Sequence, residues 1–331
     1  MATISDIAKL TRHSTATVDR VLNNRPGVRE ATRQVILKAA AELKYDRALP
    51  ASLTFDFVLP GAGGFMRVLA ERIAHCVEEA GAGRRVNVHF VDYNAPEQVV
   101  DLLDGLRDRS AGVGLVALDH ILIREALKGL IRRQVPVITL LSDISSLPHQ
   151  GYIGIDNRLA GRLAGHLIGK FLPVERRNIA VFTGSRAFRG HEEREMGFRS
   201  VLRENFPHLH IVDTLEIGES EPAGHEVTRA LLERTPDLSA LYNIGAGTGG
   251  IARALQAVPA DRKPVFVAHD LSADTRRHLL SGVIDVVIDQ NAHLTAVRAV
   301  ARLRSAVDHQ MLGVCEVMES RIIFRDNIPQ A

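Results

Sequence analysis

The spacing of apolar residues divides the chain into a short helical opening and a long body of alternating strands and helices. In residues 4–11, 15–23 and 29–44, apolar side chains recur at the three- and four-residue intervals of amphipathic helices. From residue 55 onward, short apolar runs that suit buried strands alternate with helical stretches over roughly 270 residues. The pattern predicts a three-helix unit followed by an α/β body.

Capping residues mark where the first two helices begin. Thr3 and Asp6 have the spacing of a capping box, in which each side chain bonds the backbone amide of the other residue. Ser14 is placed to cap the second helix. Turn residues at 23–27 then end that helix before a third one runs to about Lys44. Three short helices of this kind form a small bundle.

The second helix has the features of a DNA recognition helix. Its apolar face holds Val18 and Val21, so Thr15 and Arg20 lie on other faces. If the bundle presents this helix to the major groove, Arg20 could pair with guanine and Thr15 could contact a thymine methyl group. On this pattern alone, a helical cap with a solvated basic face is the alternative.

Positive charge is concentrated in the helical opening. Residues 1–50 hold nine Lys and Arg against five Asp and Glu, although the whole chain has a net formal charge of only +2. A small basic unit joined to a near-neutral body is the charge distribution expected of a DNA-binding head on a ligand-binding body. The charge therefore indicates nucleic acid as a partner.

The opening residues resemble the headpiece of the lactose repressor (LacI) family. The resemblance is carried by Thr3-Ile4-Ser5-Asp6-Ile7-Ala8-Lys9-Leu10, Ser14-Thr15-Ala16-Thr17-Val18-Asp19-Arg20-Val21-Leu22-Asn23, Pro26-Gly27-Val28, Thr32-Arg33 and Leu43-Lys44-Tyr45. It implies seven contacts with operator DNA, the first three to bases and the others near phosphates, at Thr15, Ala16, Arg20, Thr3, Ser14, Thr17 and Asn23. Pairing of two headpieces on a pseudo-palindromic operator further predicts a homodimer or a higher homo-oligomer.

Two departures from the family pattern affect the turn and the hinge. Thr11-Arg12-His13 occupies the turn where the family has Ala-Gly-Val, so a bulkier residue stands where glycine relieves backbone strain. The family's hinge helix follows the headpiece, but here Pro50 disfavours helical geometry at Leu49. A hinge helix must begin at Pro50 or be absent, and Leu53 is the candidate for the leucine that wedges into the minor groove.

The body is predicted to consist of two doubly wound parallel-sheet lobes. The expected strands are Phe55–Pro60, Val86–Val91, Val113–Leu118, Val135–Leu141, Asn178–Thr183, Ile211–Ile217, Ala240–Ile244, Pro264–Ala268 and Val283–Ile288. Their alternation with helices predicts parallel sheets covered on both faces, and the length exceeds one such sheet. The predicted domains are a headpiece of residues 1–46, a hinge of 47–54 and a body of 55–331 for effector binding and dimerisation.

Within the body, the chain is expected to change lobes near Asp156 and again near Gln290. This predicts an N-lobe of about residues 55–155 and 291–318. The C-lobe would then take about residues 156–290 and 319–331.

Polar residues that follow the strands form the candidate ligand site. In open parallel sheets, ligands bind beyond the carboxyl ends of the strands. A cleft that mixes carboxylates, amides and a guanidinium with an aromatic ring suits a sugar or polyol, whose hydroxyls both donate and accept hydrogen bonds. The candidate contacts are Phe65, Asp119, Asp143, Arg194, Asn243, Asp270 and Gln290.

The body also resembles the periplasmic sugar-binding proteins of the ribose type and the effector domain of the LacI family. The resemblance assigns ligand contacts to Arg194, Asn243, Asp270 and Gln290. Together with the headpiece, it implies a transcriptional repressor whose affinity for operator DNA is controlled by a small ligand.

A glycine-rich segment supports a competing function. Gly245–Gly250 fits G-x-G-x-x-G, follows a predicted strand and precedes Asp270 by twenty residues, which is the spacing of a dinucleotide-binding motif. An oxidoreductase is therefore the alternative, although the motif falls in the second lobe and leaves the headpiece unexplained. A solute-binding protein of a transporter would also fit the body, but it would require export.

The sequence predicts no catalytic residue, metal or cofactor. The fourteen histidines form no H-E-x-x-H motif, and the chain has no C-x-x-C, G-x-S-x-G or Walker motif. The two cysteines, Cys76 and Cys315, are far apart, which suits a reducing compartment. No apolar run approaches the roughly 18 residues that span a bilayer. We therefore expect a cytoplasmic protein without membrane contact.

Overall fold

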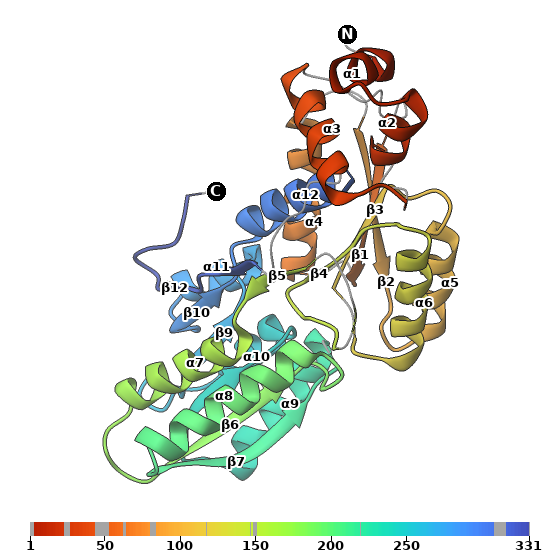
Figure 1. Ribbon diagram of the computed structural model, residues 1–331. Coiled ribbons are helices and arrows are strands. Elements are labelled where there is room, and N and C mark those ends of the chain that lie inside the picture. Colours follow the sequence, from red (N-terminus) through yellow and green to blue (C-terminus); the bar gives the residue numbers. More distant parts are fainter. Residues whose placement is uncertain are drawn as a thin grey trace. The chain divides into compact units, whose positions relative to one another are not determined.

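The computed structural model divides the chain into two compact units, Met1–Leu53 and Thr54–Ala331 (Figure 1). The structure describes residues 3–22, 27–43, 53–61, 64–79, 84–116, 118–145, 147, 151–218, 220–307 and 316–330. Residues 47–52 of the predicted hinge and the predicted phosphate contact Asn23 lie outside these residues.

The first unit contains the three predicted helices, α1 (Ile4–Thr11), α2 (Thr15–Leu22) and α3 (Glu30–Glu42). The capping box at the start of α1 is confirmed, because Asp6 accepts a hydrogen bond from the Thr3 backbone N–H and its own N–H donates to Thr3 Oγ1. Apolar side chains from all three helices form one small core, whose fully buried members are Ile7, Val18 and Ile36. Burial of this shared face holds the three short helices together.

The turn between α1 and α2 has the backbone strain that its sequence predicts. Arg12 is left-handed, with φ 56°, and it ends α1. Glycine adopts this conformation at little cost, whereas a side chain raises its energy. The turn nevertheless forms, because Ser14 caps α2 by accepting a hydrogen bond from the Thr17 N–H at 3.1 Å.

The second unit contains two six-stranded sheets, one in each lobe. The N-lobe sheet has the order β11-β5-β4-β3-β1-β2, and the C-lobe sheet has the order β12-β10-β9-β8-β6-β7. The N-lobe strands are β1 (Leu53–Pro60), β2 (Arg84–Val91), β3 (Gly112–Leu115), β4 (Val137–Leu140), β5 (Tyr152–Ile155) and β11 (Glu316–Met318). The C-lobe strands are β6 (Arg177–Thr183), β7 (Leu209–Glu216), β8 (Leu238–Asn243), β9 (Val265–His269), β10 (Val286–Asp289) and β12 (Arg321–Ile323). The predicted fold class, a helical headpiece followed by two doubly wound lobes, is confirmed.

Strand direction departs from the prediction at one edge of the C-lobe. β12 runs antiparallel to β10, with Asp289 opposite Arg321, whereas the other pairings described are parallel. The chain moves between lobes after β5, after β10 and between β11 and β12. Residues far apart in sequence therefore complete both sheets.

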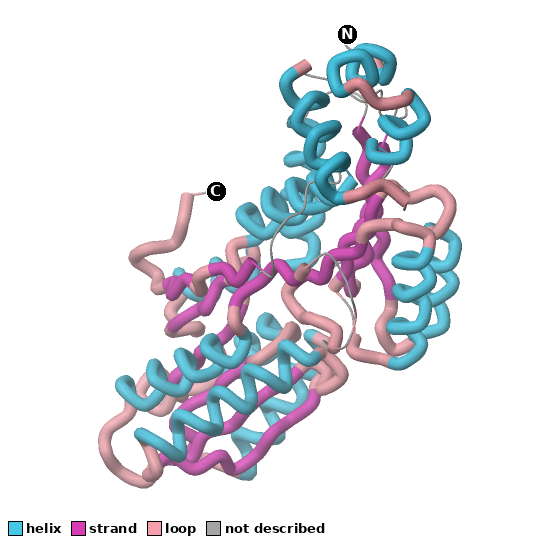
Figure 2. The backbone as a smooth tube through the Cα atoms, in the orientation of Figure 1, coloured by secondary structure: helices cyan, strands magenta, loops and turns pink. Residues whose placement is uncertain are grey.

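Helices cover both lobes, as the tube in Figure 2 shows. Those of the N-lobe are α4 (Gly64–Glu79), α5 (Pro96–Leu106), α6 (Ile121–Arg132) and α12 (Ala292–Val307). Those of the C-lobe are α7 (Asn157–Phe171), α8 (Arg189–Asn205), α9 (Glu221–Arg234), α10 (Thr248–Leu255) and α11 (Ala273–Leu280). In Figure 1, α7 and α8 lie side by side over the C-lobe sheet, and α10 packs against α9.

Glycines set the distance between α7 and α8. A Cβ atom added to Gly161 of α7 would lie 1.9 Å from the carbonyl oxygen of Arg194, and one added to Gly197 of α8 would lie 2.0 Å from that of Arg158. Backbones can approach this closely only where side chains are missing. The contact fixes the position of α8, whose first turns lie at the candidate ligand site.

Candidate ligand cavity and recognition helix

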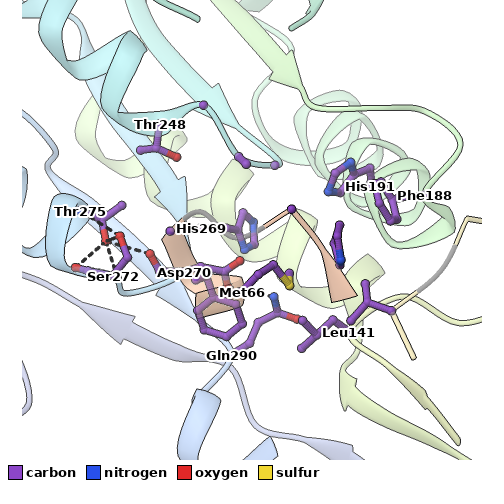
Figure 3. A pocket seen from close by; sticks show the side chains of 18 of the residues that line it. Met66, Leu141, Phe188, His191, Thr248, His269, Asp270, Ser272, Thr275 and Gln290 are labelled. Atoms are coloured by element: carbon purple, nitrogen blue, oxygen red, sulfur yellow. Dashed lines mark hydrogen bonds between the residues drawn. The ribbon is translucent and has the colours of Figure 1, made fainter. Parts of the chain in front are cut away.

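The body encloses a cavity of about 350 Å³ between loops at the carboxyl ends of strands from both lobes (Figure 3). The N-lobe contributes the segments after β1, β3 and β4, and the C-lobe contributes the start of α8 and the segments after β8, β9 and β10. This is where open parallel sheets bind their ligands. Four of the predicted contacts line it, namely Phe65, Arg194, Asp270 and Gln290.

Arg194 is held in the cavity wall by two neutral oxygen atoms. Its side chain is only 3% exposed, its Nε donates to Asn157 Oδ1 at 2.8 Å, and its Nη1 donates to the Ile244 carbonyl at 2.8 Å. No described residue accepts a hydrogen bond from Nη2. Since a buried guanidinium favours further acceptors, this side chain has the chemistry of a donor held in place at the cavity wall.

Asp270 and Gln290 form a linked pair of acceptor groups. Gln290 Nε2 donates to Asp270 Oδ1 at 2.9 Å, while Gln290 Oε1 is buried and has no partner among the described residues. Asp270 has the left-handed backbone, φ 68°, that aspartate tolerates better than most residues. Thr275 Oγ1 stabilises this turn by donating to the Asp270 carbonyl at 2.9 Å. Figure 3 shows Asp270, Gln290 and the bonded Ser272 and Thr275 along the same wall.

Asp289 positions both loops of this pair, a role that sequence analysis missed. Its carboxylate is buried and accepts hydrogen bonds from the N–H groups of Leu271 and Asn291, both at 3.0 Å. These two amides directly follow Asp270 and Gln290 in the chain. Arg321 of β12 forms an ion pair with the same carboxylate. Asp289 therefore joins the two cavity-lining loops to the edge strand of the C-lobe.

Two histidines outside the predicted set of ligand contacts also lie at the cavity wall. His269 lies at the end of β9, with its Nε2 2.8 Å from the hydroxyl of Tyr242, and His191 Nδ1 lies 2.9 Å from the Ser185 carbonyl. Burial and then the charge of Arg194 lower the pKa of His191 to about 3. The same two causes hold the pKa of His269 well below 6.5. Both rings are therefore neutral at pH 7.

Acid is expected to destabilise the body through these histidines. Between the unfolded pKa of 6.5 and the folded value of about 3, His191 binds a proton in the unfolded state only, so stability falls as the pH falls. The loss attributable to His191 is about 2 kcal/mol between pH 7 and pH 5. Urea unfolding at both pH values measures it. His191→Gln should remove the part of the pH-dependent loss in unfolding free energy that comes from His191. His293→Gln, at an exposed position of α12, should keep the full loss. The prediction is contradicted if the parent and both variants lose the same unfolding free energy between pH 7 and pH 5.

The other three predicted ligand contacts lie outside the cavity lining. Asp119 accepts hydrogen bonds from the backbone N–H and hydroxyl of Ser145. Asp143 accepts from the Thr139 hydroxyl at 2.6 Å and from the next backbone amide. Asn243 is fully buried, and its Nδ2 donates within the glycine-rich loop to two carbonyls and to Thr248 Oγ1. In this structure, these side chains organise loops.

The glycine-rich loop has a packing explanation that does not require a dinucleotide. Gly247 is left-handed at the start of α10, and a Cβ on Gly250 would lie 1.9 Å from the Glu221 carbonyl oxygen of α9. Glu221 Oε1 also accepts a hydrogen bond from the Gly249 amide at 3.2 Å. A dinucleotide would place its pyrophosphate at this helix start. The Glu221 carboxylate already lies at the start of α10, and its negative charge disfavours a pyrophosphate there.

In the first unit, α2 presents the side chains expected of a recognition helix. Thr15, Ala16 and Arg20 are exposed, whereas Val18 and Val21 face the core. Thr3 and Ser14 cap the starts of α1 and α2, and Thr17 lies in the first turn of α2, where its N–H donates to Ser14 Oγ.

Leu53 does not lie in a hinge helix. It is the first residue of β1 and is half-buried. Strand pairing therefore begins inside the segment predicted as the hinge, and insertion of Leu53 into a minor groove would require it to leave the strand.

The described residues contain neither a membrane-spanning helix nor a cluster of metal-binding side chains. No described helix is long and apolar enough to cross a membrane. The described histidines, cysteines and carboxylates form no cluster of three or more that could hold a metal ion.

The chain belongs to the periplasmic binding protein domain family, whose model matches residues 55–310. Ahead of this domain, residues 3–47 match the model of the bacterial regulatory proteins of the lacI family. The fold therefore joins a lacI-type helix-turn-helix to a periplasmic-binding-protein-like body, as the resemblance in the sequence implies.

Curated relatives of the chain are transcriptional regulators. A probable HTH-type transcriptional repressor, ExuR of Bacillus subtilis, is 27% identical over 61% of this chain and 60% of its own length. The regulator GalR of Salmonella typhimurium is 26% identical over 76% of this chain and 75% of its own. This chain thus spans less than two thirds of ExuR.

Solved structures share the fold of the body. GanP, a glucose-galactose binding protein from Geobacillus stearothermophilus, aligns with a TM-score of 0.73 at 20% identity, over 84% of this chain and 99% of its own. A solute-binding protein from Burkholderia graminis in complex with D-arabinose aligns with a TM-score of 0.76 at 21% identity, over 84% of this chain and 98% of its own.

Proposed function

We propose that the protein is a sequence-specific transcriptional repressor whose affinity for operator DNA is controlled by a sugar or polyol bound in the cavity between its lobes. The main support is the presence in one chain of an exposed recognition surface on α2 and a cavity enclosed by two lobes. The names of the curated relatives, which are regulators, agree with this proposal. The proteins of known structure that share this fold include a glucose-galactose binding protein and a solute-binding protein in complex with D-arabinose.

The charges in the cavity suit a neutral polyhydroxylated ligand. Arg194 offers donors, and Asp270 with Gln290 offers acceptors. The other two carboxylates in the lining already have basic partners, because Glu221 pairs with Arg253 and Asp274 pairs with Arg277. Hydroxyl groups can both donate and accept, so one sugar can satisfy both sides of this wall.

Binding, without a chemical step, is the proposed activity of this site, with no cofactor or metal. A sugar held by Arg194 and Asp270 lies beside histidines that are neutral at pH 7 and already bonded to Tyr242 and Ser185. We further propose that the protein acts in the cytoplasm as a homodimer or a higher homo-oligomer, because one headpiece contacts few base pairs. Its ligand would change operator affinity by binding one arrangement of the lobes more tightly than another.

Arg20→Ala tests the DNA half of the proposal. Removal of a guanidinium that pairs with guanine is expected to weaken operator binding by roughly 1 to 3 kcal/mol, or about 5- to 150-fold. The operator is first selected from a random duplex library, and affinity is then measured by fluorescence anisotropy at fixed salt. Arg253→Ala in α10 is the control, since it removes an arginine from the body only.

Two results would contradict this assignment. Equal operator affinity of Arg20→Ala and the parent would remove Arg20 from base contact. If the selection yields no duplex that binds better than random DNA, with or without sugars, the repressor function itself fails.

A further inference from the structure

The two walls of the cavity differ in chemistry. The described lining residues of the N-lobe contain no ionisable side chain, and they are Pro60, Gly61, Gly64, Phe65, Met66, Val116, Leu141 and Ser142. The C-lobe side carries Arg194, Asp270 and two histidines. In Figure 3, Met66 and Leu141 are apolar members of the first wall, and His269 and Asp270 are polar members of the second.

Ser142 has the one polar side chain among the described N-lobe lining residues. Ser142 Oγ accepts a hydrogen bond from the Gly190 amide at 3.1 Å. Asp119 and Asp143, the N-lobe carboxylates predicted to bind ligand hydroxyls, lie outside the lining and accept hydrogen bonds from the hydroxyls of Ser145 and Thr139. Hydroxyls of a ligand that faced Phe65, Met66 and Val116 would lose water without gaining a side-chain partner, and only backbone groups such as the amides in the first turn of α4 could bond them.

The size of the cavity leaves room for more than a sugar ring. Its volume of about 350 Å³ falls in the range of roughly 300 to 1,000 Å³ that accommodates drug-sized ligands. Phe65 is 7% exposed and Leu141 is 4% exposed, so both are fixed in the core and offer a rigid apolar surface. Such a surface binds methyl or aryl groups by removing them from water.

We propose that the ligand is a sugar with an apolar substituent, such as the methyl group of a deoxy sugar or an aryl group at the anomeric carbon. Its hydroxyls face Arg194, Asp270 and Gln290, and its substituent packs against Phe65, Met66 and Leu141. This inference rests on the proposed sugar-controlled function and specifies which sugars the site prefers.

Matched pairs of sugars test the inference on the full chain. Isothermal titration calorimetry compares D-galactose with D-fucose, D-glucose with its 6-deoxy form, and each hexose with its phenyl β-glycoside. In at least one pair, the substituted member should bind at least tenfold more tightly, as expected for burial of one or more carbon groups. Met66→Gln should reduce that preference about tenfold. Met196→Gln, at a side chain that is 55% exposed and outside the cavity lining, should leave it unchanged.

Each outcome bears on one of the two proposals. Equal or tighter binding of the unsubstituted sugar in every pair overturns this inference and leaves the sugar-controlled repressor intact. If no member of any pair binds while the protein still binds its selected operator, both this inference and the sugar ligand fail. A preference that survives Met66→Gln unchanged shows that the substituent does not contact the N-lobe wall, and so overturns the inference.

Discussion

Arg194→Met is expected to weaken sugar binding by roughly 10- to 150-fold, because it removes a charged donor worth about 1.5 to 3 kcal/mol. The methionine keeps most of the apolar contact, so the loss reports the guanidinium. A second result needs no ligand. Since burial and then the charge of Arg194 lower the pKa of His191 to about 3, loss of that charge should raise it. Calorimetry with the best-binding sugar and NMR titration of the histidine rings measure the two effects.

Arg199→Met is the matched control for this prediction. Arg199 lies one turn further along α8, where it bonds Glu195 and Thr214 away from the cavity lining. Sugar affinity and the pKa of His191 should stay near the parent values in this variant. Parent-like sugar affinity in Arg194→Met would move the ligand site away from the start of α8.

Gly161→Ala is expected to destabilise the body by about 3 kcal/mol, the upper part of the range for overpacked cores. The new Cβ would lie 1.9 Å from the carbonyl oxygen of Arg194, and neither helix backbone can yield locally. α7 and α8 must therefore separate. Because Arg194 lies at that contact, the same change should also weaken sugar binding. Urea unfolding and calorimetry measure the two losses.

Gly105→Ala controls for the intrinsic effect of alanine in a helix. Gly105 lies in α5, and the nearest atom to its added Cβ is the flexible end of Arg109 at 3.8 Å. Alanine there should stabilise the chain by roughly 0.5 to 1 kcal/mol. If Gly161→Ala were as stable as Gly105→Ala, the close contact of α7 with α8 would be disproved.

The architecture could be predicted because its main elements carry strong local signals. The capping box of Thr3 and the apolar face of Val18 and Val21 define the headpiece within a few residues of the observed helices. Long apolar runs such as β1 and β6 are recognisable because strands buried on both faces contain few polar residues.

Three short strands, two of them at sheet edges, escaped prediction because pairing partners define them. β11 and β12 have three residues each, and β5 has four. Runs this short do not show a period, and only contact with a neighbouring strand makes them extended. The antiparallel direction of β12 likewise depends on its neighbour β10.

The ligand site could be located in outline, but its individual contacts could not. Arg194, Asp270 and Gln290 follow strands or begin helices in ways that the resemblance makes recognisable. Asp119 and Asp143 follow strands equally well, yet each bonds a nearby serine or threonine, a choice that sequence position does not determine.

The residues outside the predicted set of ligand contacts act through tertiary contacts. His191 and His269 face the cavity only because α8 and β9 converge there. Asp289 directly precedes Gln290, and that spacing is the one local signal that could have suggested its positioning role.

The two edge strands also constrain how the body folds during synthesis. Residues 316–323 supply β11 to one sheet and β12 to the other, so a ribosome that has made only the first 300 residues has produced two sheets with open edges. Open edges invite pairing with other chains. Neither lobe can reach its final form before the other, and a premature stop after α12 would leave both unfinished.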